Sequence, residues 1–95
     1  NKKVGVIATK TTVRQKSYVT AIHNQDPEIE VFQQAAPLLV PLVEESWLDD
    51  PITNLIVYRY LSPLMASQID TLVLGCTHFP FLLNAIQKVV GPTVT

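Results

Sequence analysis

Short apolar runs alternate along the chain with longer segments in which apolar residues recur at helical spacing. Residues 4–8 (VGVIA) are apolar without polar alternation, which is typical of a strand covered on both faces. Residues 29–33 (IEVFQ) alternate in part, which predicts a second strand at an edge or a less buried place of the sheet. Residues 72–74 (LVL) predict a third, buried strand, and residues 93–95 (TVT) begin a fourth.

The segment after the first run predicts a helix that continues to about Asn24. Threonine hydroxyls at Thr9, Thr11 and Thr12 can cap its start, and capping is the default role that we assign to them. The sequence N-Q-D-P at residues 24–27 breaks the helix. Roughly in line along it lie Val13, Ser17, Ala21 and Ile22.

Two prolines shape the next segment. Pro37 and Pro41 stand four residues apart and permit helix only in a first turn or at a kink, so we predict a loop and a short helical turn that ends near Trp47. Asp50 then caps a new helix, with Pro51 in the first helical position.

The helix that begins at Pro51 is predicted to reach Leu61. Ser62 and Pro63 are typical of a second cap, so residues 64–69 form either a separate short helix or a continuation past a kink. The sequence leaves these two alternatives open.

The last helix is predicted to follow Pro80. Lys88 suits its final turn, Gly91 the position after the helix, and Pro92 the stop. The residues predicted to share one apolar face are Leu82, Leu83, Ile86, Val89 and Val90.

Strands that alternate with helices predict an α/β fold. We expect a three-layer αβα arrangement around a short, mostly parallel sheet of about four strands, similar to Rossmann or flavodoxin-like folds, with residues 1–95 forming one domain. In open sheets of this kind ligands bind outside the carboxyl ends of the strands. Three junctions are predicted at that edge: residues 8–12, 35–42 and 75–78.

Composition narrows the function classes. A formal charge of −1 over 95 residues gives no electrostatic case for binding nucleic acid or an anionic membrane. No apolar run approaches the roughly 18–20 residues of a membrane-spanning helix, and we expect a cytoplasmic protein. The single cysteine excludes an internal disulfide, and His23 and His78 lie too far apart to suggest a zinc site. Because the chain opens directly before one strand and stops in another, we expect it to be one domain of a larger protein.

Candidate chemistry centres on Cys76, which follows the glycine that ends the third strand. We expect this thiol to head a helix, where unpaired N–H donors and a partial positive charge stabilise a thiolate. The alternative is a cysteine that only fills space as a small apolar residue. Residues 76–82 contain no arginine, which argues against phosphatase-type chemistry.

The neighbours of Cys76 also have two interpretations each. Thr77 can cap the helix or hold a substrate carboxylate. His78 is either a solvated polar residue or a group that tunes the thiol and transfers a proton. Glu44 and Glu45 lie at the second junction, where a pair of charges is usually a solvated face.

These residues match a known family. The sequence L-G-C-T-H-F-P at residues 74–80 resembles the Gly-Cys-Thr-His-(Tyr/Phe)-Pro motif of glutamate racemases, in the aspartate/glutamate racemase superfamily. Residues 4–13 and 35–44 are similar to two further segments of that family, and residues 70–74 resemble the family's segment directly before the motif. His78 favours glutamate racemases, because aspartate racemases typically have glutamate at this position.

The resemblance has two small departures and one large gap. Ala8 replaces a common glycine, and Ala36 replaces a common cysteine that is not catalytic in the family. The family has two catalytic cysteines on two similar α/β domains that face each other across a cleft. The other domain carries a Cys-Asn-Thr motif and an Asp-Ser-Gly segment, and neither occurs here. We therefore predict that residues 1–95 are the inserted second domain of a two-domain racemase.

The resemblance implies an isomerase that interconverts L- and D-glutamate by proton transfer between two thiols, without pyridoxal phosphate or a metal, and so supplies D-glutamate for peptidoglycan. It implies that Cys76 faces the α-proton of the L-enantiomer and that His78 assists proton transfer there. Thr77, His78 and Thr12 are implied to bind substrate, and Glu44 to orient His78. The implied partners are glutamate and the missing domain, with a homodimer among the assemblies left open.

Two other functions remain open at this stage. One is a related racemase for aspartate or another amino acid. The other is a non-catalytic α/β binding domain in which Cys76 is structural.

Overall fold

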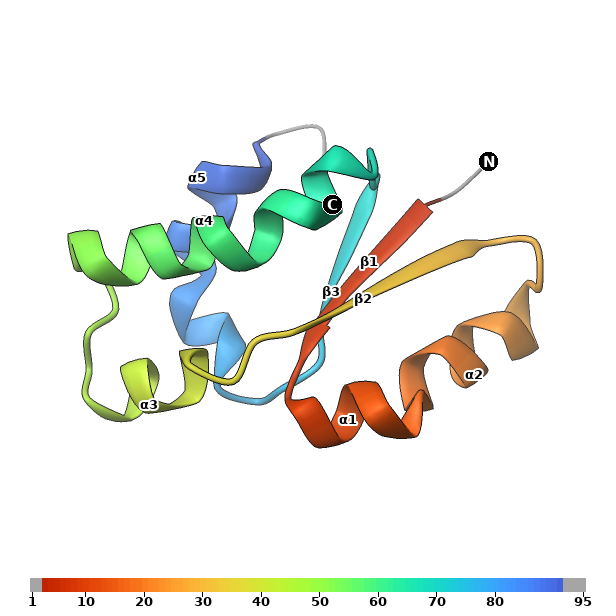
Figure 1. Cartoon of the computed structure of the whole chain (residues 1–95), viewed down its shortest axis with the longest axis horizontal. Coiled ribbons are helices and arrows are strands. Elements are labelled where there is room, and N and C mark those ends of the chain that lie inside the picture. The colour runs from red at the N-terminus through yellow and green to blue at the C-terminus, as the bar shows by residue number, and fades with distance from the viewer. Residues whose placement is uncertain (1–2, 92–95) are drawn as a thin grey trace.

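The computed structural model describes residues 3–91, which form an α/β fold around a three-stranded sheet (Figure 1). Its strands are β1 (Lys3–Ala8), β2 (Glu30–Ala35) and β3 (Thr71–Leu74), in the order β2-β1-β3. Both pairs are parallel, as the alternation of strands and helices predicts. The fourth strand predicted at residues 93–95 lies outside the described residues.

The strands end at one edge of the sheet. In the parallel register Ala8 pairs with Ala35, and Ile7 pairs with Leu74. The carboxyl ends of all three strands therefore lie side by side, and the segments that follow them meet at this edge.

β1 is the central strand, which confirms its predicted burial on both faces. Val6, Ile7 and Ala8 have no exposed surface. β2 lies at an edge and is only partly buried, as its alternating sequence predicts, although it covers residues 30–35 and not 29–33.

Helices cover both faces of the sheet. The face that carries Val4, Val6 and Ala8 packs against α1 (Lys10–Gln15) and α2 (Ser17–Gln25), which lie below the strands in Figure 1. The opposite face, to which Ile7 belongs, holds the larger core cluster.

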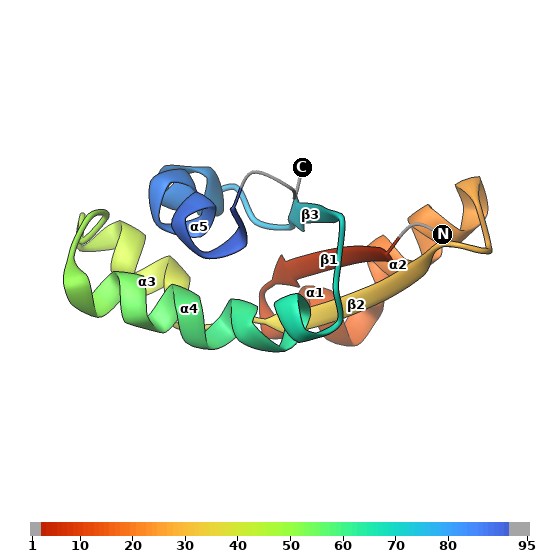
Figure 2. The same cartoon turned by 90° about the horizontal axis from the view of Figure 1, so that it is seen from above.

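The larger cluster is enclosed by the helices that follow β2 in the chain. They are α3 (Leu39–Glu44), α4 (Pro51–Ala66), the short 3₁₀ helix η1 (Phe79–Leu82) and α5 (Leu83–Val90). Figure 2 shows α3 and α5 at one end of the molecule and α1 and α2 at the other. Among the helices of residues 3–91, none is long and apolar enough to cross a membrane.

The single helix predicted from Thr9 to about Asn24 is wrong. Lys16 adopts a left-handed conformation (φ 56°) and divides the segment into α1 and α2. Ser17 and Ala21, predicted in line with Val13, are exposed. Packing explains the break, because Val13 of α1 and Tyr18 and Ile22 of α2 all pack against the same face of the sheet.

The helix that begins at Pro51 follows its predicted start. The Asp50 carboxylate accepts a hydrogen bond from the Ile52 N–H at 2.8 Å, which confirms the cap before Pro51. The helix then runs without interruption to Ala66 with Pro63 inside it, so the alternative of a separate short helix is wrong. The short helix before it ends at Glu44, earlier than the predicted end near Trp47.

The C-terminal helical segment is divided as well. η1 comes first, and α5 begins only at Leu83. Leu82, Ile86 and Val90 are buried as predicted, whereas Leu83 is 45% exposed, because the change from 3₁₀ to α geometry turns it away from the core. Gly91 closes α5 with φ 74°, which confirms the predicted glycine at the helix end.

Candidate active site

The segment Gly75–His78 is held at both ends at the carboxyl edge of the sheet. The Gly75 N–H donates a hydrogen bond to the carbonyl oxygen of Ile7 at 2.8 Å. At the other end the Phe79 N–H donates to the carbonyl oxygen of Cys76 at 3.2 Å, and the Phe79 side chain is fully buried. The loop that carries the thiol is therefore tied to the central strand and to the core.

Within this loop the thiol contacts an imidazole. The Sγ atom of Cys76 lies 3.7 Å from Nδ1 of His78, and both residues are half-buried. A thiol and an imidazole in contact form a pair that can exchange a proton, which is the arrangement that activates many catalytic cysteines. The structure thus brings together two of the predicted site residues.

The prediction that Cys76 heads a helix is wrong in its geometry. The turn after β3 leads into η1, which begins at Phe79, and the first α-helix starts at Leu83. Because helix-dipole stabilisation acts within the first turn and η1 has a single turn, the structure does not support the expected helix N-terminus at the thiol. The imidazole of His78 is the polar group that contacts it.

Thr77 does not cap the following helix. His78 occupies the cap position of η1, and its side chain makes no capping hydrogen bond. Thr77 is exposed at the edge of the sheet. Its hydroxyl can therefore be reached by a ligand, and the predicted contact with a substrate carboxylate stays a prediction.

The threonines after β1 form a local cap, as predicted. Thr9 accepts a hydrogen bond from the Thr12 N–H at 3.4 Å, and its hydroxyl donates to the Thr12 hydroxyl oxygen at 3.0 Å. Thr11 is exposed. The Thr12 hydroxyl retains a proton to donate, so its predicted role in holding a substrate carboxylate is chemically compatible with this cap.

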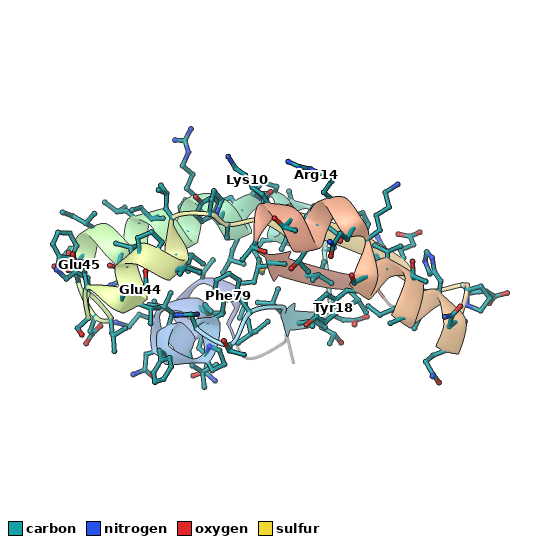
Figure 3. The ribbon with its side chains drawn as sticks, turned by 90° about the horizontal axis from the view of Figure 1, so that it is seen from below. Lys10, Arg14, Tyr18, Glu44, Glu45 and Phe79 are labelled. Atoms are coloured by element: carbon teal, nitrogen blue, oxygen red, sulfur yellow. The ribbon has the colours of Figure 1, made fainter. Side chains whose placement is uncertain are left out.

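Glu44 is the last residue of α3 and is exposed. In Figure 3 it lies on the side of α3 toward Phe79, whereas Glu45 lies at the outer end. Within residues 3–91 the structure gives no hydrogen bond between Glu44 and His78, so the predicted orientation of the imidazole by this carboxylate stays a prediction. α3 does pack against η1, the element that follows His78.

The three predicted junctions converge on the end of β1. The Ala36 N–H donates to the carbonyl oxygen of Ala8 at 2.8 Å, and the Gly75 N–H donates to that of Ile7. The loops after β2 and β3 are therefore both bonded to the last two residues of the central strand. This arrangement confirms that the three predicted junctions meet at one edge of the sheet.

Sequence reasoning missed two side chains that support the loop. Phe79, which is labelled in Figure 3, anchors it in the core. The ring of Tyr18, also labelled there, lies against Gly75, where an added β-carbon would be 3.0 Å from Cε2. A signal for Tyr18 was present, because it stands four residues before the apolar Ile22 and so shares its helical face.

No protein-family model matches the chain. A curated glutamate racemase from Neisseria meningitidis serogroup A is 57% identical to it over 91 residues, which are 96% of this chain and 34% of that protein. The crystal structure of a glutamate racemase isoform from Bacillus anthracis has a TM-score of 0.93 and 40% identity, and the match covers 98% of this chain and 35% of that one.

The crystal structure of a glutamate racemase from Francisella tularensis, in complex with D-glutamate, has a TM-score of 0.90 and 37% identity over 95% of this chain and 34% of that one. The chain spans about a third of the length of the relatives that it matches. Since both its sequence and its fold match these proteins along nearly its whole length, the chain belongs to the glutamate racemase family, as one segment of such a protein.

Proposed function

We propose that the protein containing this chain interconverts L- and D-glutamate, and that this chain supplies one side of its active site. The observation that carries the proposal is the contact between Cys76 Sγ and His78 Nδ1 at the carboxyl edge of the sheet. It occurs in a chain that is similar to glutamate racemases, one of which was solved with D-glutamate.

Racemisation places a specific demand on the site. The α-carbon loses a proton on one face and gains one on the other, so one base and one acid must flank it. The chain has a single cysteine. We therefore propose that the opposing thiol comes from the part of the protein outside this chain, with residues 1–95 as the inserted second domain of a two-domain enzyme.

We assign roles to the residues at the edge of the sheet as follows. Cys76 removes or returns the α-proton on the face exposed in the L-enantiomer, and His78 accepts and returns the thiol proton. The exposed Thr77 donates hydrogen bonds to the substrate, and Thr12 contacts its carboxylate from the neighbouring junction. Glu44 orients His78 once substrate and the second domain are in place.

The proposed reaction needs no cofactor, because the two thiols carry out both proton transfers. Its product, D-glutamate, would serve peptidoglycan synthesis, and a cytoplasmic location fits that role. The homodimer named among the implied assemblies is tested by measuring the oligomeric state of the full-length protein in solution.

The test uses the full-length protein in deuterium oxide, with wild type, Cys76→Ser and the control Ala66→Ser. A serine hydroxyl is a far weaker acid than a thiol, so Cys76→Ser should lower racemisation by about 100-fold or more. It should also abolish deuterium exchange into L-glutamate while exchange into D-glutamate persists. Ala66 is an exposed residue of α4, and Ala66→Ser should leave the wild-type rates unchanged.

Three outcomes would contradict the proposal. If Cys76→Ser kept racemisation within about threefold, less than ~1 kcal/mol of barrier, Cys76 would not transfer the proton. If the wild-type protein exchanged aspartate or another amino acid in place of glutamate, the substrate would be wrong. If no amino acid exchanged and the thiol were inert to alkylation, a binding domain would be the better description.

A further inference from the structure

The backbone at Gly75 is enclosed on three sides. A β-carbon at this position would lie 3.0 Å from the β-carbon of Ala8, 3.0 Å from the carbonyl oxygen of Ile7 and 3.0 Å from Cε2 of Tyr18. Two of these neighbours belong to the central strand, which is hydrogen-bonded to a strand on each side. The third is an aromatic side chain from α2, so Tyr18 is the one of these three neighbours that lies on a helix.

The break at Lys16 puts Tyr18 in this position. In one continuous α-helix, Tyr18 would lie about 140° around the axis from Val13, and the two could not face the same surface. The left-handed Lys16 changes the direction of the chain, and Val13, Tyr18 and Ile22 then all pack on the face of the sheet that carries Val6. The non-glycine residue at positive φ is therefore the feature that directs the Tyr18 ring toward the loop.

The ring, and not the hydroxyl, makes the contact. Among the Tyr18 atoms, the ring carbon Cε2 is the one that comes within 3.0 Å of a β-carbon placed at Gly75, and the Tyr18 hydroxyl has no hydrogen-bond partner among residues 3–91. Glycine has more backbone freedom than any other residue, so a glycine turn keeps a single conformation only when its surroundings hold it. Gly75 immediately precedes Cys76, and the other end of the loop is fixed because Phe79 is buried in the core. A change in the dihedral angles of Gly75 would therefore have to be taken up within residues 76–78, which would move the thiol relative to His78.

We propose that Tyr18 is a positioning residue for the Cys76 thiol: its ring holds the Gly75 turn and thereby keeps Sγ within 3.7 Å of Nδ1 of His78. The expected effect on turnover rests on the proposed function. The expected effect on the thiol's own reactivity does not, because that reactivity can be measured without substrate.

The test compares Tyr18→Phe, Tyr18→Leu and Tyr18→Met in the full-length protein, with Tyr58→Leu as the control. Tyr58 lies on α4 and is 60% exposed. For each variant, kcat and KM for glutamate are measured, together with the rate at which iodoacetamide alkylates the Cys76 peptide at one fixed pH. Circular dichroism and thermal unfolding establish that each variant is folded.

Tyr18→Phe keeps the ring and should retain kcat and the alkylation rate within about twofold. Tyr18→Leu and Tyr18→Met should lower kcat by about tenfold or more with KM within about threefold, because substrate still binds while the thiol is misplaced. They should also slow alkylation severalfold, since the thiol loses its imidazole partner. Local unfolding alone would have the opposite effect on the alkylation rate, because it would expose the thiol and make alkylation faster. Tyr58→Leu should match wild type.

The proposal is overturned if folded Tyr18→Leu or Tyr18→Met alkylates at the wild-type rate, or if Tyr18→Phe is as defective as Tyr18→Leu. If neither Tyr18→Leu nor Tyr18→Met folds, Tyr18 is a core residue and the positioning role is rejected. If the wild-type protein does not racemise glutamate, the proposed function fails separately, and the alkylation rates still decide whether Tyr18 positions the thiol.

Discussion

The Sγ atom of Cys76 lies 3.7 Å from Nδ1 of His78, and the two residues are separated by one residue in the same loop. Both partners of the contact come from the same short loop, so no distant residue supplies either of them. It does need the loop to be anchored, which the buried Phe79 ring and the hydrogen bond from the Gly75 N–H to Ile7 achieve. The candidate proton-transfer pair is thus local in sequence, and its geometry is maintained by the core.

The role of His78 can be tested with His78→Asn in the full-length protein. Asparagine is favoured at helix cap positions, so η1 should form, while turnover should fall by about tenfold or more because the thiol loses its proton partner. The pH dependence of turnover should change too, because the substitution removes a group that can bind and release a proton. Turnover and solvent-deuterium incorporation are measured in both directions across pH.

The chain offers a matched control in its other histidine. His23 is exposed, and its Nε2 lies 3.0 Å from the carbonyl oxygen of Ile29, far from the site in sequence. His23→Asn should therefore keep the wild-type profile. Identical pH profiles for His78→Asn and wild type would reduce His78 to a surface residue.

Glu44→Gln should give a milder defect in the same direction as His78→Asn. If the carboxylate orients the imidazole during turnover, its loss should lower kcat by a few-fold, or about 1 kcal/mol, while the fold is unchanged. Glu45 is the adjacent exposed carboxylate, and Glu45→Gln is the control, expected to match wild type. Equal behaviour of the two variants in steady-state kinetics would remove Glu44 from the site.

Phe79 and Phe81 differ sharply in burial, although both lie in η1. Phe79 has no exposed surface and Phe81 is 65% exposed. Phe79→Ala should lower the free energy of unfolding by about 3–5 kcal/mol, because it leaves a cavity in the core. Phe81→Ala should change it by less than about 1 kcal/mol in the same urea titration. Similar losses for the two variants would mean that Phe79 does not anchor the loop.

The N-terminal cap of α4 allows a similar comparison, between the neighbouring residues Asp49 and Asp50. Asp50→Ala removes the acceptor for the Ile52 N–H and should cost about 1 kcal/mol of unfolding free energy. Asp49 pairs with Lys88 at 3.6 Å on the surface, where both side chains are mostly exposed. Asp49→Ala should therefore cost less than about 0.5 kcal/mol. A larger loss from Asp49→Ala than from Asp50→Ala, measured by urea unfolding, would contradict the assignment of the cap.

The features that the sequence determined depend on near neighbours along the chain. The unbroken apolar run at residues 4–8 predicted a central strand, because a strand that is covered on both faces has no face exposed to solvent and so needs no polar residues. Asp50 and Pro51 started a helix, and Gly91 ended one, through backbone preferences that hold in any fold. Parallel order, and with it the edge where Cys76 lies, followed from the alternation of strands and helices.

Only the tertiary structure decided the features that depend on packing against distant residues. At three places the local backbone preference and the burial of apolar surface in the core favour different structures. They are the break at Lys16, the continuous helix through Pro63 and the 3₁₀ turn before α5. The contact of Tyr18 with Gly75 joins residues 57 positions apart and exists only because α2 packs on the sheet beside the end of β3. A local backbone preference is worth up to about 1 kcal/mol for most residues and about 3 kcal/mol for a proline inside a helix, whereas each large side chain that is buried contributes about 1.5–3 kcal/mol. Packing therefore prevailed where the two disagreed, and at Pro63 it did so because α4 buries Val57, Leu61 and Leu64 together.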